Sequence, residues 1–287
     1  MDHLVPVADG VRLNVLRWPG GDPAYLLVHG LASNASLWTE VAESLSAQGH
    51  RAFAVDLRGH GESDRPDTGY DTATSAADLA SLADALELRG LIVAGQSWGG
   101  NVVVRLAASR PDLVAALALI DGGWIDLATA FGSWEECEAA LRPPELDGQR
   151  ADDVRRYIRS SHPSWSARAI EATLANLRVR PDGRLERRLP IPQHMQIVRS
   201  MWEEPPSPYF SLITAPTLLA PAIPDDPARA RAKRTAVEMA ARALGGPAVL
   251  REYVGGDHDL HAQQPEALAA DLLALAGRLA PPDWTPS

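Results

Sequence analysis

Hydrophobic residues along this chain fall into short, mostly apolar runs that alternate with longer segments of helical spacing. Runs of the first kind lie at 24–30, 51–59, 90–96 and 116–122. Their apolar positions are nearly continuous, which is typical of strands that are covered on both faces of a sheet. Between them, segments such as 75–88 repeat apolar residues at helical intervals. This alternation predicts an α/β fold with a mostly parallel sheet.

The alternation stops for about ninety residues in the middle of the chain and then returns. We therefore predict an α/β core formed by residues 1–121 and 213–287, interrupted by a largely helical cap at 122–212. The cap contains several tryptophans and the turn-forming sequence RPDGR at 180–184. The proline-rich segment 203–209 is expected to be the hinge through which the chain returns to the core.

Composition and charge narrow the function classes. The 287 residues are 46% hydrophobic and 22% charged, as in an ordinary soluble globular protein. The formal net charge of −10 argues against nucleic acid as a partner, because phosphate binding requires clustered Lys and Arg. No apolar run approaches the roughly 20 residues needed to cross a bilayer, and the first residues do not resemble a secretory signal. We expect a cytoplasmic protein that does not bind membranes.

Two residue types limit the possible chemistry. Cys137 is the only cysteine, which excludes a disulfide framework and any multi-cysteine metal site. Lys233 is the only lysine and lies in a helix-like segment, which makes Schiff-base chemistry improbable. We expect no metal and no cofactor.

The sequence AGQSWGG places a serine between two glycines, after an apolar run and before a helical pattern. Gly95, Ser97 and Gly99 match G-x-S-x-G in the strand-turn-helix context that this motif requires. The glycines allow neighbouring backbone to approach a sharp turn that holds the serine at a helix N-terminus. Ser97 is therefore predicted to be a nucleophile.

A serine hydroxyl needs a base to remove its proton. The chain has eight histidines, and six of them lie at element edges, in the cap or in turns after strands: His3, His29, His50, His60, His162 and His194. The remaining two, His258 and His261, lie in a loop between the last apolar run and the last helical segment. A metal site at this pair is disfavoured because no further ligand pattern accompanies it.

Five motifs in order resemble the α/β-hydrolase superfamily. They are LLVHGLASNASLW, DLRGHGESD, GQSWGG, APTLLAPAIPDDP and GGDHDLHAQQPEAL, and they cover the core on both sides of the cap. The resemblance implies the α/β-hydrolase fold, with the cap inserted into it. It selects His258 as the base, because the family's histidine usually precedes a Pro-Glu helix start by seven residues. His261 would then line the pocket or cap the helix.

The resemblance also implies an acid that orients the histidine. Family strands of this type place it nine residues after a proline, which from Pro216 gives Asp225. Asp226 and Asp121 are the alternatives, and the latter follows the preceding strand, where some relatives carry the acid.

The other implied site residues are backbone donors and pocket residues. The backbone N–H groups of Leu31 and Trp98 would form the oxyanion hole. Asp56, Arg58 and His60 are expected to be structural. The candidates for substrate binding are His29, Trp124, Trp134, Trp165 and His261.

We therefore expect a serine hydrolase that cleaves a small carboxylic ester or lactone, with a small apolar or aromatic molecule as its substrate. A carbon–carbon bond hydrolase and a perhydrolase or haloperoxidase of the same fold are alternatives within the serine enzymes. Serine at the nucleophile position, on the sharp turn, disfavours an epoxide hydrolase or a haloalkane dehalogenase, because these enzymes use a carboxylate there. A receptor-like member that binds its ligand with little turnover is a further alternative. The sequence does not specify an oligomeric state.

Overall fold

The computed structural model describes residues 4–279, and its centre is an eight-stranded sheet of order β1-β2-β4-β3-β5-β6-β9-β11. The strands from β4 to β11 in this order are parallel, whereas β2 runs antiparallel to both β1 and β4. The bounds are β1 (Leu4–Pro6), β2 (Arg12–Trp18), β3 (Gly21–Val28), β4 (His50–Val55), β5 (Leu91–Gln96), β6 (Val114–Ile120), β9 (Thr217–Ala220) and β11 (Ala248–Leu250).

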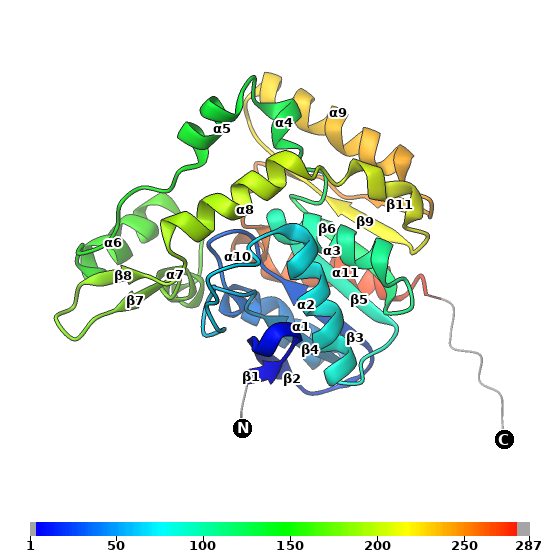
Figure 1. Cartoon of the computed structure of the whole chain (residues 1–287). Coiled ribbons are helices and arrows are strands. Elements are labelled where there is room, and N and C mark those ends of the chain that lie inside the picture. Colours follow the sequence, from blue (N-terminus) through cyan, green and yellow to red (C-terminus); the bar gives the residue numbers. More distant parts are fainter. Residues whose placement is uncertain (1–3, 280–287) are drawn as a thin grey trace.

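Helices cover both faces of this sheet, as the nearly continuous apolar runs predict (Figure 1). In β3, Leu26 and Val28 face one apolar cluster, whereas Tyr25 and Leu27 face the other. The first cluster lies under α2 (Thr72–Ala85), α3 (Trp98–Ser109) and α9 (Pro227–Ala243). The second lies under α1 (Thr39–Ala47) and α11 (Pro265–Ala276). The predicted α/β-hydrolase fold with a mostly parallel sheet is confirmed.

Between β6 and β9 the chain leaves the sheet and forms mainly helices (Figure 1). These are α4 (Leu127–Ala130), α5 (Trp134–Leu141), α6 (Ala151–Ser161), α7 (Ala167–Leu174) and α8 (Ile191–Glu203), with a hairpin of β7 (Leu177–Val179) and β8 (Leu185–Arg187). The hairpin turns at the predicted RPDGR sequence, where Gly183 has φ 76°. We refer to this segment as the cap.

The cap packs on the core in two parts. Apolar residues of α4, α5 and α8 belong to the same cluster as α2 and α3. Those of α6, α7 and the hairpin form a separate cluster with two short helices of the core, η2 (Ala35–Trp38) and α10 (Leu260–Gln263). The boundaries at 122 and 212 stay a prediction.

The last apolar run of the core is divided in the structure. The apolar run at 248–254 forms β11 and a separate two-residue strand, β12 (Tyr253–Val254). The latter pairs with β10 (Ala222–Ile223) in a small parallel sheet beside the large one.

Two further 3-10 turns are η1 (Ala8–Gly10) and η3 (Ser207–Leu212). Within residues 4–279, none of the helices combines the length and the apolar character needed to cross a membrane.

Candidate active site

Ser97 lies on the turn that joins β5 to α3. Its backbone has φ 54° and ψ −126°, a conformation that side-chain-bearing residues rarely adopt. The backbone N–H of Ser97 donates to the carbonyl of Ile120 at 3.0 Å, so the turn is anchored to the end of β6. The serine is only partly buried. The predicted sharp strand-to-helix turn is present.

Two glycines permit the close contacts around this turn. A Cβ on Gly95 would lie 2.3 Å from the carbonyl oxygen of Gly99, which explains the first glycine of the motif. A Cβ on Gly30 would lie 2.9 Å from the Cβ of Ser97. The loop that follows β3 therefore passes directly beside the serine.

His258 is bonded to Asp121, which corrects the interpretation based on the spacing from Pro216. The two groups lie 2.6 Å apart, from Nδ1 of the imidazole to Oδ2 of the carboxylate. Asp121 follows β6, and Gln96, which precedes the serine, is paired in register with Ile120 of that strand. Parallel neighbouring strands thus bring Ser97 and Asp121 to the same edge of the sheet.

Asp225 and Asp226 are differently placed. Both are exposed at the start of α9, and the side chain of Asp226 caps that helix by accepting the N–H of Arg229 at 2.8 Å. Asp225 lies near Gly255, at the start of the histidine loop. The carboxylate of Asp121 is instead buried, with 2% of its side chain exposed. Geometry and burial thus favour Asp121 over the expected Asp225 as the partner of His258.

The histidine loop is also attached to β5 and to the cap. The side-chain amide of Gln96 donates to the carbonyl of His258 at 3.0 Å. The indole N–H of Trp165 in the cap donates to Asp257 at 3.0 Å. Both contacts restrain the backbone on either side of the imidazole.

Two backbone N–H groups beside Ser97 are free to donate. Trp98 is the first residue of α3, so its N–H has no acceptor within the helix. Within the described part of the chain, neither this N–H nor that of Leu31 is engaged in a hydrogen bond. Their use as an oxyanion hole stays a prediction.

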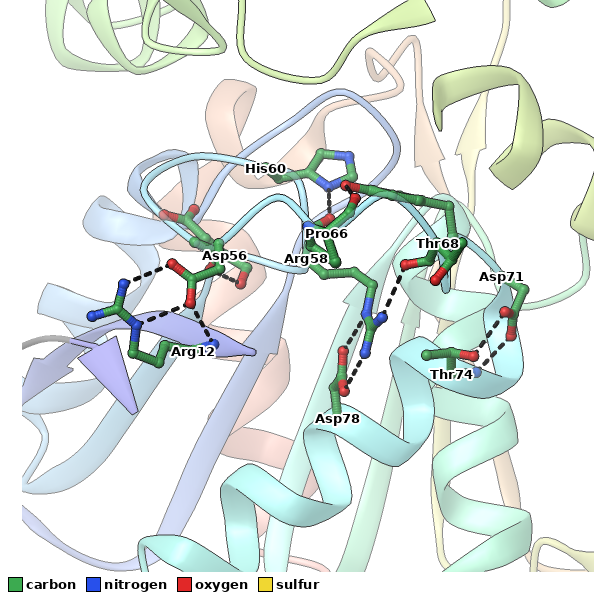
Figure 2. A network of polar contacts seen from close by, with 12 residues as sticks. Arg12, Asp56, Arg58, His60, Pro66, Thr68, Asp71, Thr74 and Asp78 are labelled. Carbon is green, nitrogen blue, oxygen red and sulfur yellow. Dashed lines mark hydrogen bonds and ion pairs between the residues drawn. The ribbon is translucent and has the colours of Figure 1, made fainter. Parts of the chain in front are cut away.

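Figure 2 shows a network of polar contacts around the loop that follows β4, with the Arg58–Asp78 pair within it. Arg58 forms an ion pair with Asp78 of α2, with Nε 2.6 Å from the carboxylate. Asp56 accepts the backbone N–H groups of Ala35 at 2.7 Å and Glu62 at 3.0 Å. These contacts agree with the structural role predicted for Asp56 and Arg58.

His29 and His261, two of the candidates for substrate binding, are enclosed by core residues. His29 is fully buried, and its Nε2 accepts the N–H of Leu57 at 3.0 Å, while burial lowers its pKa to about 4. His261 is also fully buried and packs on Trp38, with ring centroids 4.6 Å apart. Both are packing residues of the core because no open surface remains on either ring.

Three tryptophans of the cap that are candidates for substrate binding also pack against neighbours. Trp134 makes an edge contact with Trp202 at 6.0 Å and lies under the guanidinium of Arg199. Trp165 stacks on His162 at 4.0 Å, and Trp124 is packed against the large core cluster. None of the three is among the residues that line the large cavity at the cap. Their expected contact with substrate therefore stays unsupported by the geometry.

The large cavity lies between the cap and the loops of the core. Its volume is about 590 Å³. The core side is formed by Ala32, Ser33, His60 and Gly61, and the cap side by residues of α6, α7 and the hairpin. Ser97 itself does not line this cavity, but the loop after β3 lines it at Ala32 and lies beside the serine at Gly30.

Lys233 contacts the same carboxylate as His258, a contact that sequence reasoning missed. Its Nζ lies 2.7 Å from Oδ1 and 2.9 Å from Oδ2 of Asp121. Burial raises the pKa of Asp121, but the hydrogen bond from His258 and the charge of Lys233 outweigh it, so the pKa lies below its usual value. A single lysine on a polar helix gives no sign of this contact in the sequence.

The charges around His258 act in opposite directions. Loss of hydration lowers the pKa of His258, but the hydrogen bond to Asp121 and the charges of Asp259 and Asp121 raise it above the usual value. The charge of Lys233 opposes the rise. Loss of hydration is the largest single effect, and the hydrogen bond to Asp121 together with the two carboxylate charges outweighs it.

Lys233→Met is expected to move the acid limb of the kcat/KM–pH profile to higher pH. Without the ammonium group the pKa of His258 rises further, so the neutral imidazole, the form that can accept a proton, is lost earlier as pH falls. The alkaline plateau should change little. The measurement is the pH profile of ester hydrolysis.

Two variants provide controls for this prediction. Lys233→Arg keeps the charge and should restore the profile, and Arg234→Met removes the neighbouring cation, which pairs with Glu252 instead. An unshifted acid limb in Lys233→Met would show that the lysine has no electrostatic effect on the histidine.

Metal ligands are not gathered anywhere in residues 4–279, where no three His, Cys, Asp or Glu side chains converge on a point that could hold an ion.

Two curated proteins match part of the chain. The chain is 38% identical over 118 residues to a non-heme chloroperoxidase of Streptomyces lividans, which covers 40% of this chain and 43% of that protein. It is 40% identical over 110 residues to the esterase Rv0045c of Mycobacterium tuberculosis, and this match covers 38% of this chain and 36% of that protein. The chain thus spans less than half the length of these curated relatives.

A solved structure matches over nearly the whole length. The structure of E-2-(acetamidomethylene)succinate hydrolase has a TM-score of 0.77 and 26% sequence identity, and the match covers 96% of this chain and 100% of that one. Residues 23–179 match the family model described as the alpha/beta hydrolase fold. The chain therefore belongs to the alpha/beta hydrolase fold family, whose members named above are enzymes.

Proposed function

We propose that the chain is a cofactor-independent serine hydrolase that cleaves a small carboxylic ester or lactone. The observation that carries this proposal is the placement of Ser97 on a strained turn at the end of β5, next to the end of β6, where Asp121 is hydrogen-bonded to His258. A hydroxyl in this position becomes reactive when a neighbouring imidazole accepts its proton.

In the proposed reaction, Nδ1–H of His258 donates to Asp121 and leaves Nε2 as the base. The base takes the proton of Ser97 as its oxygen attacks the carbonyl carbon. The backbone N–H groups of Leu31 and Trp98 stabilise the oxyanion. His258 then returns the proton to the leaving alcohol, and water cleaves the acyl-enzyme in the same manner.

The carboxylate of Asp121 orients the imidazole and stabilises its protonated form. The four acceptor contacts of this carboxylate, from Ala222, Lys233 and His258, hold it in one position. The cavity of about 590 Å³ supports a small substrate.

A second candidate is hydrolysis of a small amide. The solved structure that matches 96% of the length of this chain is that of E-2-(acetamidomethylene)succinate hydrolase, whose name indicates an acetamide group in its substrate. The same nucleophile, base and oxyanion donors would serve both reactions, because both pass through a tetrahedral intermediate.

A substrate panel tests the proposed function. 4-Nitrophenyl esters from acetate to octanoate, γ-butyrolactone and 4-nitroacetanilide are assayed without added metal or cofactor. We expect turnover of short-chain esters, which decreases as the acyl chain outgrows the cavity. An amide cleaved faster than every ester would favour the second candidate. A protein that binds an ester without any turnover would be a receptor-like member and would contradict the proposal.

A further inference from the structure

Two consecutive arginines, Arg187 and Arg188, form part of the wall of the large cavity between cap and core. They lie at the end of β8 and directly after it, in the cap. The net charge of the chain is −10. A concentration of positive charge at a cavity wall is therefore a local exception to the charge of the protein as a whole.

The bonding of the two guanidinium groups is incomplete. Arg188, whose side chain is 16% exposed, donates to the carbonyl of Gly61 at 3.0 Å and pairs with Glu62 at 2.6 Å. Arg187 donates from Nη2 to the carbonyl of Pro144. The Nε atoms of both arginines are buried without an acceptor in the part of the chain that the structure describes.

The charges at the cavity do not cancel. Asp153 also lines the cavity, but it is paired with Arg156 of the same helix. Arg188 is paired with Glu62. Among residues 4–279, Arg187 has no carboxylate partner, so its charge is the unbalanced one.

Neighbouring cations strengthen the positive potential. Burial lowers the pKa of Arg65, and the charges of Arg188 and Arg178 lower it further. An anion that bound at the two arginines would reduce this repulsion.

We propose that Arg187 and Arg188 bind a carboxylate group of the substrate, so that the preferred substrates are esters carrying a free carboxylate. This inference rests on the proposed function, in which the ester group of the substrate reacts with Ser97. The loop after β3 lies beside Ser97 at Gly30 and lines the cavity at Ala32, so the proposal places the substrate along this loop, with its carboxylate at the arginines and its ester group at Ser97.

The charge balance favours a carboxylate over a phosphate monoester. Only one cation at the cavity is unbalanced, which matches a group with one negative charge. A phosphate monoester carries nearly two charges at neutral pH and would also approach the carboxylate of Asp153.

A matched pair of substrates tests the inference. Monomethyl succinate carries a free carboxylate, whereas dimethyl succinate is its neutral counterpart, and methanol release reports both reactions. We expect the wild-type protein to prefer the monoester by about 10- to 100-fold in kcat/KM, the range of a charge-assisted hydrogen bond. Arg187→Gln should lose this preference, because it lowers kcat/KM for the monoester more than for the diester.

Two variants control for charge and for general damage to the cap. Arg187→Lys retains the charge without the planar donor pair and should keep part of the preference. Arg180→Gln removes a cation of the same hairpin that pairs with Asp182 and does not line the cavity, so it should behave as wild type. Equal rates for the two esters in the wild type, or equal losses for both in Arg187→Gln, would overturn the inference.

A binding experiment separates this inference from the proposed function. Calorimetry measures monomethyl succinate and inorganic phosphate binding to Ser97→Ala, with and without Arg187→Gln. We expect the monoester to bind more tightly than phosphate, and only when Arg187 is present. If the wild type cleaves no ester but this binding persists, the carboxylate site stands and the proposed function fails. If the wild type cleaves the diester but the monoester does not bind, or phosphate binds more tightly, the carboxylate site is wrong.

Discussion

Ser97→Ala is expected to lower kcat for ester hydrolysis by a factor on the order of 10⁶, as removal of the nucleophile does in a serine protease. Alanine leaves the backbone turn in place but offers no atom that can form an acyl-enzyme. Thermal unfolding should be nearly unchanged, because the partly buried hydroxyl makes no hydrogen bond that the structure shows within residues 4–279. The measurement is the steady-state rate with the best ester of the panel.

A variant that retained a tenth or more of the wild-type rate would show that another group attacks the carbonyl. Ser33→Ala is a suitable control, since its hydroxyl is buried at the cavity wall without a hydrogen-bond partner in the described part of the chain. It should change KM more than kcat.

Asp121→Asn is expected to lower kcat by about 10⁴-fold, the loss found when the triad acid is replaced by its amide in the serine-protease example. An amide cannot stabilise the protonated imidazole and can present an N–H donor to Nδ1, which would favour the wrong tautomer. Asn also removes the charge that pairs with Lys233. Some loss of stability is therefore expected beside the loss of activity, and circular dichroism is needed to show that the variant is folded.

Asp225→Asn and Asp226→Asn are the matched comparisons. Asp225 is exposed, and Asp226 caps α9 through the N–H of Arg229. Each variant should stay within roughly tenfold of the wild-type kcat, as expected for exposed charges that are weakly coupled to the site. A severe loss in Asp225→Asn together with a nearly normal Asp121→Asn would restore the interpretation drawn from the spacing.

The sequence predicted the features that depend on residues close together in the chain. The glycines around Ser97 predict a sharp turn because they admit backbone contacts that no side chain would tolerate, and this turn is present. The order of apolar runs likewise predicts the layered fold. Both inferences depend on neighbours in the chain, which a single sequence displays.

The choice of acid depended on contacts between distant segments. Asp121 and Asp225 follow strands that end at the same edge of the sheet, so spacing along either strand cannot decide between them. The course of the chain after each strand distinguishes the two residues. Asp225 is exposed at the start of α9, whereas Asp121 is buried and hydrogen-bonded to His258.

The contacts of Lys233 and of the two cavity arginines were hidden for the same reason. Lys233 reaches Asp121 across 112 positions of sequence. Arg187 lies in a stretch that the sequence marks only as polar and proline-containing, and its place at a cavity follows from the way the hairpin packs against α6 and α7.

Covalent labelling with a fluorophosphonate tests the central claim most directly. The probe forms a stable adduct with a serine that is activated beside an oxyanion hole, and peptide mass spectrometry identifies the modified residue. We predict one adduct, on Ser97, which is absent from Ser97→Ala and strongly slowed in Asp121→Asn. An adduct on another residue, or a catalytically active wild-type protein that remains unlabelled, would contradict the account.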